Sequence, residues 1–433
     1  MIVKNNPKTI RAWAFYDWAN SAYPLVITTA IFPIFFQKVT SSQLPNGEIN
    51  DRVLFFGFDF INTELYGYVF SFSFLLVSAL SPILSGIADY SGSKKKFLQF
   101  FCYLGSFGCA LLFFFSPDYL ELSMFFVLLA SIGFWSSLVF YNAFLPEIAD
   151  ARLHDKVSAQ GFAYGYFGSA LLLIGILILI QTETMPVRYA FLAVAIWWSG
   201  FAQVTYAHLP NNVFGKKVPK KDLFLRGYQE LQKVWRELGY LMNLRRFLRS
   251  FFVYSMGVQT VMLMAVLFAK KEVDWQGQGD TGLIISVLII QFIAILGAYL
   301  FAKSSKRLGN IPVLGTALVV WIFVCASAYF IQTPLHFYIL AAVVGLVMGG
   351  VQALSRSTYS KMLPETQDHA SYFSFYDVLE KLGIVVGTFF FSFIEGVTDS
   401  MRNSALVLML FFIVGLFLLF MVKREDSINP MKH

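Results

Sequence analysis

Leu145-Pro146-Glu147 closes one long apolar run of the sequence, and Leu363-Pro364-Glu365 closes another, 218 residues further along a chain of 433 residues. Each tripeptide is followed by a short loop and then by a new apolar run with two glycines four residues apart, at Gly161 and Gly165 and at Gly383 and Gly387. Small residues at this spacing let membrane helices approach closely. The sequence therefore predicts two similar halves.

The composition is that of a membrane protein. Hydrophobic residues make up 57% of the chain and charged residues only 14%, and the mean hydropathy is +0.63. A soluble enzyme of this size needs a more polar exterior. The three cysteines lie in apolar stretches without CxxC spacing, and neither a HExxH zinc motif nor a Walker-type phosphate loop occurs. We therefore expect no enzyme activity, no metal and no cofactor.

Runs of about 20 apolar residues, enough to cross a bilayer as a helix, define twelve predicted spans. They lie near 13–37, 64–88, 97–115, 121–145, 158–180, 187–208, 247–269, 281–302, 312–332, 335–358, 371–394 and 402–422. An even number of spans in each half makes the repeat parallel. The predicted fold is an all-α membrane protein of twelve transmembrane helices in two parallel six-helix bundles. The predicted domains are residues 1–210 and 247–433, joined by a linker over 211–246.

The distribution of basic residues predicts the orientation. With both termini on the cytoplasmic side, 26 of the 33 Lys and Arg fall in cytoplasmic segments and six fall on the opposite side. The net charge of +7 is then mainly a topology signal, with some attraction to anionic lipid, and it gives no support to nucleic-acid binding.

The linker is basic and ends in an amphipathic pattern. Its first part carries four lysines, at positions 216, 217, 220 and 221. Apolar residues then recur at helical spacing, at Leu231, Val234, Trp235, Leu238, Leu241 and Met242. We expect a cytoplasmic helix that lies in the membrane interface; a helix that docks a partner is the alternative.

The loop after the second span carries a recognisable signature. Residues 85–95 read Ser-Gly-Ile-Ala-Asp-Tyr-Ser-Gly-Ser-Lys-Lys, which resembles the loop motif G-x-x-x-D-x-x-G-x-[RK] of major facilitator transporters, with Ser85 in place of the first glycine. The equivalent loop of the second half keeps Gly309 but has Lys306 where the Asp falls. The resemblance implies a conformational switch made of Asp89, Gly92 and Lys94, whose Asp faces the Ser371 end of the eleventh span; a simple solvated turn is the alternative.

Four further blocks narrow the resemblance, and the similarity covers nearly the whole chain. They are residues 15–23 (Phe-Tyr-Asp-Trp-Ala-Asn-Ser-Ala-Tyr), 140–147, 158–166 and Gln352-Ala-Leu-Ser-Arg356-Ser. Their order and sequence are similar to the vacuolar amino-acid effluxer-like branch of the major facilitator superfamily. That resemblance implies two six-helix bundles and transport, with export of leucine-like amino acids in the fungal members.

Charged residues inside the spans are candidate functional groups, because an ionised side chain in hydrocarbon is costly unless it is paired or hydrated. Asp17 and Asn20 lie three residues apart on one face of the first span. Facing a central cavity, Asp17 is predicted to bind a proton or the amino group of a substrate. A structural carboxylate held by a neighbouring donor is the alternative.

The eleventh span holds Asp377, Glu380 and Lys381, spaced so that Asp377 and Lys381 can pair while Glu380 lies on the same patch. Such a cluster suits a gate that breaks and reforms, or a proton site at Glu380; a permanent packing network is the alternative. Arg356, in the tenth span, joins the gate or binds a carboxylate, or instead snorkels toward water.

Uncharged polar residues complete the predicted site. Asn20, Asn142, Gln259 and Gln352 fall in spans one, four, seven and ten, which line the cavity in this superfamily. They offer hydrogen-bond donors and acceptors without a fixed charge.

The sequence predicts a secondary active transporter that moves a small polar solute, with amino acids as one possibility, by alternating access and with the proton as coupling ion. We expect a monomer in a lipid bilayer, at the inner membrane of a bacterium. The alternatives are a receptor or scaffold that keeps the fold without moving solute, and an exporter of lipids or drugs.

Overall fold

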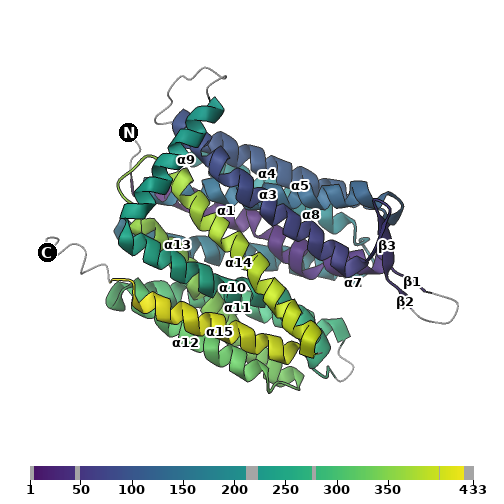
Figure 1. Cartoon of the computed structure of the whole chain (residues 1–433). Coiled ribbons are helices and arrows are strands. Elements are labelled where there is room, and N and C mark those ends of the chain that lie inside the picture. Colours follow the sequence, from purple (N-terminus) through teal and green to yellow (C-terminus); the bar gives the residue numbers. More distant parts are fainter. Residues whose placement is uncertain (1–3, 44–48, 211–222, 276–278, 399, 424–433) are drawn as a thin grey trace.

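The computed structural model describes residues 4–43, 49–210, 223–275, 279–398 and 400–423. Long helices run side by side, with their axes close to one direction (Figure 1). The helices of the first half are α1 (Pro7–Asn20), α2 (Phe32–Thr40), α3 (Asn62–Ser91), α4 (Lys94–Leu111), α5 (Leu120–Ala143), α6 (Leu145–Ile148), α7 (His154–Gln181) and α8 (Tyr189–His208). After α9 (Leu223–Tyr240) come α10 (Met242–Glu272), α11 (Gly279–Leu308), α12 (Asn310–Ala328), α13 (Pro334–Met362), α14 (His369–Thr398) and α15 (Met401–Phe420).

The first span is one continuous rod with a changed helical pitch in its middle. Pro7 stands at the start of α1, where the side chain of Asn6 accepts a hydrogen bond from the backbone of Lys8. A π-helical segment, η1 (Tyr23–Ala30), follows α1, and α2 then completes the span. Pro24 and Pro33 lie at the starts of η1 and α2, where a missing backbone N–H disturbs the helix least.

Short hairpins connect the first span to α3. Strands β1 (Ser42–Gln43) and β2 (Ile49–Asn50) form one antiparallel pair, and β3 (Arg52–Phe55) and β4 (Phe58–Ile61) form another in which Arg52 lies opposite Ile61. Phe56 and Gly57 make the turn with positive φ. We call this end of the molecule the hairpin end (Figure 1).

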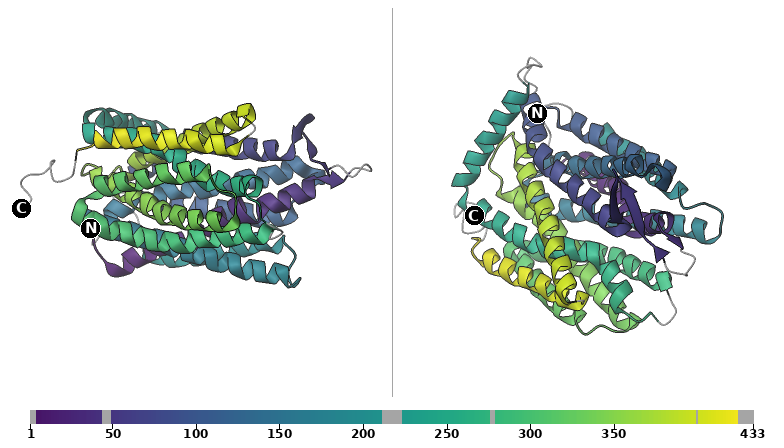
Figure 2. Two further views of the ribbon diagram at one scale, coloured as in Figure 1. Left: turned by 90° about the horizontal axis from the view of Figure 1, so that it is seen from below. Right: turned by 45° about the vertical axis from the view of Figure 1, so that its right-hand side comes forward.

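The opposite end holds the starts of α1, α4 and α10 and the connection between α13 and α14. Lys94, Lys95 and Lys96 lie here, and Lys423, near the end of the described chain, is hydrogen-bonded to Asn243. We call it the basic end. Helix α9 crosses this end rather than running along the bundle, as Figure 2 also shows.

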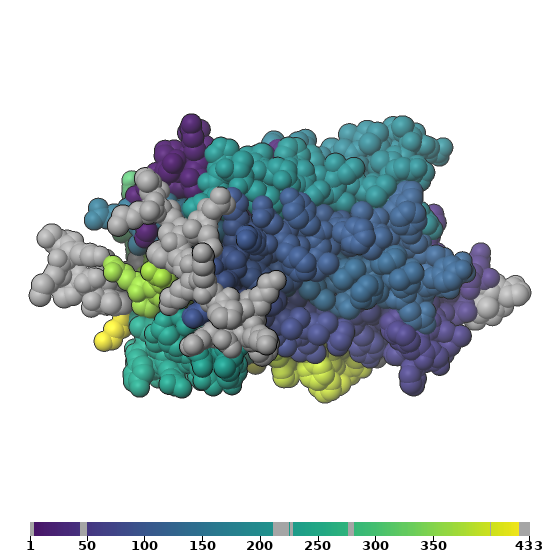
Figure 3. Space-filling model, turned by 90° about the horizontal axis from the view of Figure 1, so that it is seen from above, coloured from purple at the N-terminus to yellow at the C-terminus, as the bar shows by residue number. Residues whose placement is uncertain are grey.

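The helices form two bundles that meet along one seam. Within the first bundle α4 packs on α5 and α8, and α1 packs on α7 and α8; within the second, α15 packs on α10 and α12, and α11 packs on α13. Across the seam α3 contacts α14, and α7 contacts α11 and α13. Seen from above, the helices of the first half make a closely packed surface of blue and teal atoms (Figure 3).

Among the described residues, eleven helical segments are long and apolar enough to cross a membrane. They match eleven of the twelve predicted spans. The other predicted span corresponds to α14, which is 30 residues long, packs between α3 and α10, and carries Asp377, Glu380 and Lys381 in its interior. Buried charges thus distinguish α14 from its neighbours.

The predicted linker over 211–246 includes helix α9. Helix α9 ends at Tyr240, and α10 begins at Met242, before the predicted boundary at 247. Val234 and Leu238 are buried against the protein, whereas Trp235 is largely exposed, with its ring 5.5 Å from that of Phe375 on α14. The four lysines at 216–221 lie outside the described residues, and the domain boundaries themselves stay predictions.

Candidate functional site

A buried ion pair joins the two bundles at their seam. Asp17 lies on α1 and Arg356 on α13, and both Nη atoms of Arg356 donate to the same carboxylate oxygen of Asp17 at 3.2 Å. The hydroxyl of Tyr141, on α5, donates to that oxygen at 2.8 Å. Asp17 is 5% exposed and Arg356 is 4% exposed, so neither side chain snorkels to water. The pair ties three helices together.

Arg356 uses its whole guanidinium. Its Nε donates to the hydroxyl of Ser158 and one Nη to the Ser158 carbonyl, both at 2.9 Å, while the other Nη reaches the amide oxygen of Asn142 at 3.3 Å. The rings of Trp13 and Phe162 lie 5.0 and 4.1 Å from the guanidinium carbon. With its donors engaged and its faces covered, Arg356 is bound to the carboxylate of Asp17, in a cluster separate from that of Asp377, Glu380 and Lys381; its role in a gate stays a prediction.

Glycines on α7 make room for this pair. A Cβ on Gly161 would lie 2.4 Å from the carboxylate of Asp17 and 3.0 Å from Arg356, which is too close for real atoms. A Cβ on Gly165 would lie 2.4 Å from the hydroxyl of Ser21. The paired glycines therefore let α7 pass directly over α1.

A second charged group lies on α14. Lys381, which is fully buried, is bonded to Asp377 one turn away and donates to Glu380 at 3.1 Å. Its ammonium also sits 4.1 Å from the ring of Trp135, on α5 of the first bundle. The amide of Gln259, on α10, donates to the other oxygen of Glu380 at 2.7 Å. The three charged side chains, whose net charge is −1, are thereby held by groups on α5, α10 and α14.

The members of this group differ in their access to water. The side chains of Asp377 and Lys381 are 5% and 0% exposed, whereas that of Glu380 is 19% exposed. One oxygen of Asp377 has no hydrogen-bond partner among the described residues. Glu380 is therefore the most exposed carboxylate of the group.

The predicted amides take different positions. Gln352 bridges the seam, because its oxygen accepts a hydrogen bond from the hydroxyl of Tyr166 on α7, while its nitrogen contacts the sulfur of Met262 at 3.2 Å. Met262 lies one turn beyond Gln259 on α10. Asn20 is 1% exposed, and its Nδ2 has no partner among the described residues. A buried amide without a partner is one place where a ligand group gains a hydrogen bond.

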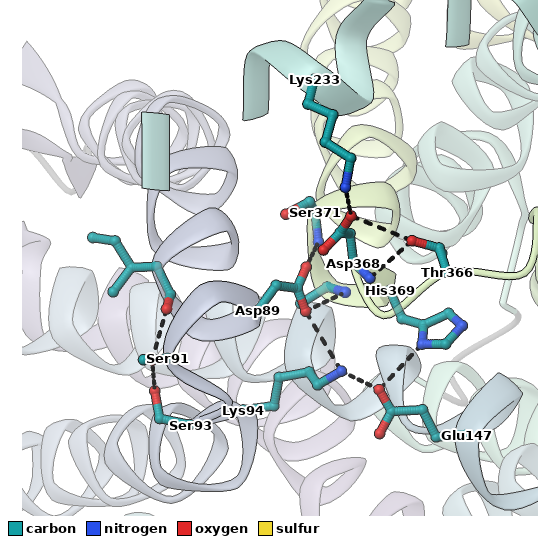
Figure 4. Close-up of polar contacts among 12 residues, drawn as sticks. Asp89, Ser91, Ser93, Lys94, Glu147, Lys233, Thr366, Asp368, His369 and Ser371 are labelled. Atoms are coloured by element: carbon teal, nitrogen blue, oxygen red, sulfur yellow. Dashed lines mark hydrogen bonds and ion pairs between the residues drawn. The ribbon is translucent and has the colours of Figure 1, made fainter. Parts of the chain in front are cut away.

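The switch loop contacts the opposite bundle at the basic end. The two oxygens of Asp89 accept hydrogen bonds from the backbone of Ser371 at 2.7 Å and of Ala370 at 3.2 Å, in the first turn of α14 (Figure 4). A carboxylate is favourable at this end of a helix, where backbone N–H groups are unpaired. Gly92 follows α3 in the left-handed conformation, with φ of 61°, and turns the chain toward α4.

Lys94 extends this contact. Its ammonium lies 3.4 Å from Asp89 and is bonded to Glu147, the acid of the first Leu-Pro-Glu tripeptide. Glu147 also accepts from the ring of His369, the first residue of α14, at 3.1 Å (Figure 4). The first tripeptide therefore belongs to the switch. Its counterpart Glu365 lies in the exposed connection between α13 and α14.

Helix α9 covers the same connection. Lys233 donates to Asp368 at 2.5 Å (Figure 4). Glu237 accepts from the hydroxyl of Tyr372 at 2.7 Å. Burial alone would raise the pKa of Asp368, but the hydrogen bonds from Lys233 and its neighbours outweigh it and hold the pKa below the usual value. The same contact outweighs the effect of burial on Lys233 and raises its pKa.

A cavity of about 490 Å³ opens beside this helix at the basic end. It is lined by Asp89, Tyr90, Glu230, Lys233, Glu365, Thr366, Gln367 and Asp368. Half of the lining residues are acidic, and the lining comes from the end of α3, from α9 and from the connection between α13 and α14. Among the described residues no group of three His, Cys, Asp or Glu side chains is placed to hold a metal ion.

The structure brings the predicted residues together in three places. Asp17, Asn142 and Arg356 share one cluster; Gln259, Asp377, Glu380 and Lys381 share a second; and Asp89, Gly92 and Lys94 share a third. Gln352 is held by Tyr166 instead, and the oxygen of Asn20 accepts from the hydroxyl of Ser21 at 3.3 Å, outside these three clusters. The prediction missed Tyr141 and Ser158, which complete the Arg356 cluster, although both lie in the quoted sequence blocks. It also missed Asp155, described below.

The chain is similar to a known protein family over nearly its whole length. The model of the family described as "Vacuole effluxer Atg22 like" matches residues 5–432. The chain is 31% identical to the MFS-type transporter YxiO of Bacillus subtilis over 436 residues, covering 98% of this chain and 97% of that one. It is 24% identical to autophagy-related protein 22 of Kluyveromyces lactis, covering 94% and 92% of the two chains.

Solved structures show the same fold. The human organic anion transporter MFSD10 has a TM-score of 0.71 at 11% identity and covers 96% of this chain and 100% of its own. The Escherichia coli fucose:proton symporter FucP has a TM-score of 0.64 at 14% identity, covering 96% and 98%. The predicted major facilitator fold, two parallel bundles of transmembrane helices, is confirmed.

Proposed function

We propose that this chain, which belongs to the Atg22-like vacuole effluxer family and is an MFS-type transporter, moves a small solute that carries an amino group, such as an amino acid, with the proton as coupling ion. The observation that carries the proposal is Glu380. It is a partly exposed carboxylate in the middle of a transmembrane helix, held by Gln259 from α10 and by Lys381 from its own helix.

The chemistry of this group favours a solute amine. A carboxylate accepts hydrogen bonds and attracts an ammonium group, and Gln259 and Gln352 add amide groups that both donate and accept. Lys381 is fully buried behind two carboxylates, so it is not offered to an anionic solute. A neutral or zwitterionic amine thus suits the site better than an organic anion.

The same carboxylate provides a coupling mechanism. An ion drives transport only if its affinity differs between the two states of the carrier. The contacts of Glu380 involve α10 and α14, and Lys381 reaches Trp135 of the other bundle, so movement of the bundles changes the surroundings of Glu380. We propose that Glu380 takes up a proton in one state and releases it in the other.

Alternating access requires contacts that separate when the bundles rock. The Asp17–Arg356 pair and the Asp89 contact with α14 both cross the seam toward the basic end, and we propose that they hold this end closed in the present state. Because basic loops stay inside, we further propose that the basic end and both termini are cytoplasmic.

Reconstitution tests the proposal. Purified protein in proteoliposomes is assayed for counterflow of radiolabelled leucine, lysine and glutamate, and for uptake driven by an imposed pH gradient. We expect leucine to exchange and a pH gradient to drive it. Glu380→Gln should slow counterflow, because the site loses the carboxylate for the amine, and should lose the response to the gradient.

The matched control is Glu395→Gln, on the same helix α14, where Glu395 pairs with Lys271 at the hairpin end. It should behave as the native protein. A pH gradient that drives the Glu380→Gln variant equally well would remove the proton role. Absence of any exchange, with a folded protein, would favour the receptor or scaffold alternative.

A further inference from the structure

The second half of the chain has a turn equivalent to the switch loop. Gly309 lies between α11 and α12 with φ of 84°, and Gly92 lies between α3 and α4 with φ of 61°. Their separation of 217 residues nearly equals that of the two Leu-Pro-Glu tripeptides. The second turn, however, has Lys306 where the first has its Asp, so the sequence makes it look degenerate.

The structure shows a carboxylate at this second turn that comes from the other side of the seam. Asp155 lies in the first turn of α7 and is 3% exposed. One of its oxygens accepts from the amide of Asn310 at 2.8 Å, and the other accepts from the hydroxyl of Ser305 at 3.0 Å and from Lys361 at 2.7 Å. Asn310, Ser305 and Lys361 all belong to the second bundle.

We infer that Asp155 is the carboxylate of a second contact that holds the basic end closed, beside the contact of Asp89 with α14. In this second contact the helix start carries the acid and the turn carries the donors, the reverse of the first. In the first contact the turn supplies the acid, Asp89, and the start of α14 supplies backbone donors. In the second contact the start of α7 supplies the acid, and the turn supplies donors from Asn310 and Ser305. Asp155 is therefore a positioning residue of the transport cycle.

The surroundings support a contact that forms only when the basic end is closed. One of the three hydrogen-bond donors to Asp155 is a cation, Lys361, at the end of α13. Asn310 is itself held in place, because its amide also donates to the hydroxyl of Thr358 at 2.8 Å. His154, beside Asp155, uses its ring to contact the carbonyl of Ala149 in its own bundle. Separation of α7 from α11 would leave the carboxylate and its donors to water.

A cluster of four alanines next to this contact provides a reporter. Ala159 on α7 packs against Ala298 and Ala302 on α11 and Ala353 on α13. Ala302 is 5% exposed and lies one turn before Ser305. The three native cysteines are buried, so they give little background reaction. In purified protein, the rate at which N-ethylmaleimide labels an Ala302→Cys variant reports opening of the basic end.

Asp155→Asn in this reporter background should raise the labelling rate by about fivefold, since the contact biases the closed state. Asp89→Asn should act in the same direction, and the double variant should exceed either single change. Asn310→Ala, which removes one donor, is the milder variant should Asp155→Asn fold poorly. Glu272→Gln, which breaks a pair with Arg402 inside the second bundle, is the matched control and should leave the rate unchanged.

The inference rests on the alternating-access part of the proposed function, but labelling needs no substrate. If labelling responds while no solute exchanges, the substrate proposal fails and the closing contact stands. If Asp155→Asn and Asn310→Ala only lower the melting temperature, with labelling as in the control while Asp89→Asn raises it, the role assigned to Asp155 is wrong and the cluster is ordinary packing.

Discussion

Arg356 of the second bundle donates from two nitrogens to one oxygen of Asp17 in the first, and both side chains are shielded from water. The link joins residues 339 positions apart in the sequence. Because an unpaired charge is costly in this setting, the pair either persists or is exchanged as a unit for water when the seam opens.

Asp17→Asn removes the charge partner of Arg356 and leaves a buried guanidinium. We expect a loss of about 3 kcal/mol in stability of the closed state and a loss of most solute exchange. Thermal unfolding in detergent and counterflow in proteoliposomes measure the two effects. An Asp17→Asn protein with native exchange would contradict a gating role for the pair.

Gly161→Ala tests the space above this pair. The added Cβ would lie 2.4 Å from the carboxylate of Asp17, so α7 must move away or the pair must break, at a cost of about 2 kcal/mol. Gly175→Ala, on the same helix, meets no atom within 4 Å and serves as the control. Thermal unfolding should separate the two variants; equal melting temperatures would show that the helix adjusts without strain.

The cluster on α14 should show strong coupling between its charges. Lys381→Gln leaves Asp377 and Glu380 without their cation, with an expected loss of about 3 kcal/mol. Combining it with Asp377→Asn removes one of the two uncompensated charges, so the double variant should be more stable than Lys381→Gln alone. A double-mutant cycle of melting temperatures measures this, and purely additive losses would argue against the pairing.

The contact of α9 with Asp368 predicts a pH dependence. Since the pKa of Asp368 is lowered in the folded protein, its stabilising contribution is present above the usual carboxyl range and is lost as pH falls through the folded value. Lys233 is half-exposed, so the contribution is below about 1 kcal/mol. Lys233→Met should therefore lower the melting temperature slightly at neutral pH, and this effect should shrink as the pH falls below the usual carboxyl range.

Arg236→Met, which removes an exposed cation from the same helix, is the control for this measurement. High salt should shrink the Lys233→Met effect, because the pair is partly hydrated. A difference between native protein and Lys233→Met that grows on acidification would have the wrong sign and would exclude Asp368 as the partner.

The sequence alone determined the architecture, because the bilayer imposes it. A membrane core without water forces backbone polar groups into helices, so apolar runs of about 20 residues report the spans directly. Contacts along one helix could also be predicted from the sequence. Asp377, Glu380 and Lys381 were predicted to meet because residues three or four positions apart lie about one helical turn from each other. These features depend on neighbours within a few residues of each other.

Only the tertiary structure decided which residues meet across the seam. Nothing in the local sequence pairs Asp17 with Arg356 or Asp155 with Asn310, because those contacts arise from the docking of two bundles joined through a linker. The sequence also suggested that the second turn had lost its switch, since Lys306 replaces the acid. The acid was instead supplied by a distant helix, which periodicity and motif spacing do not record.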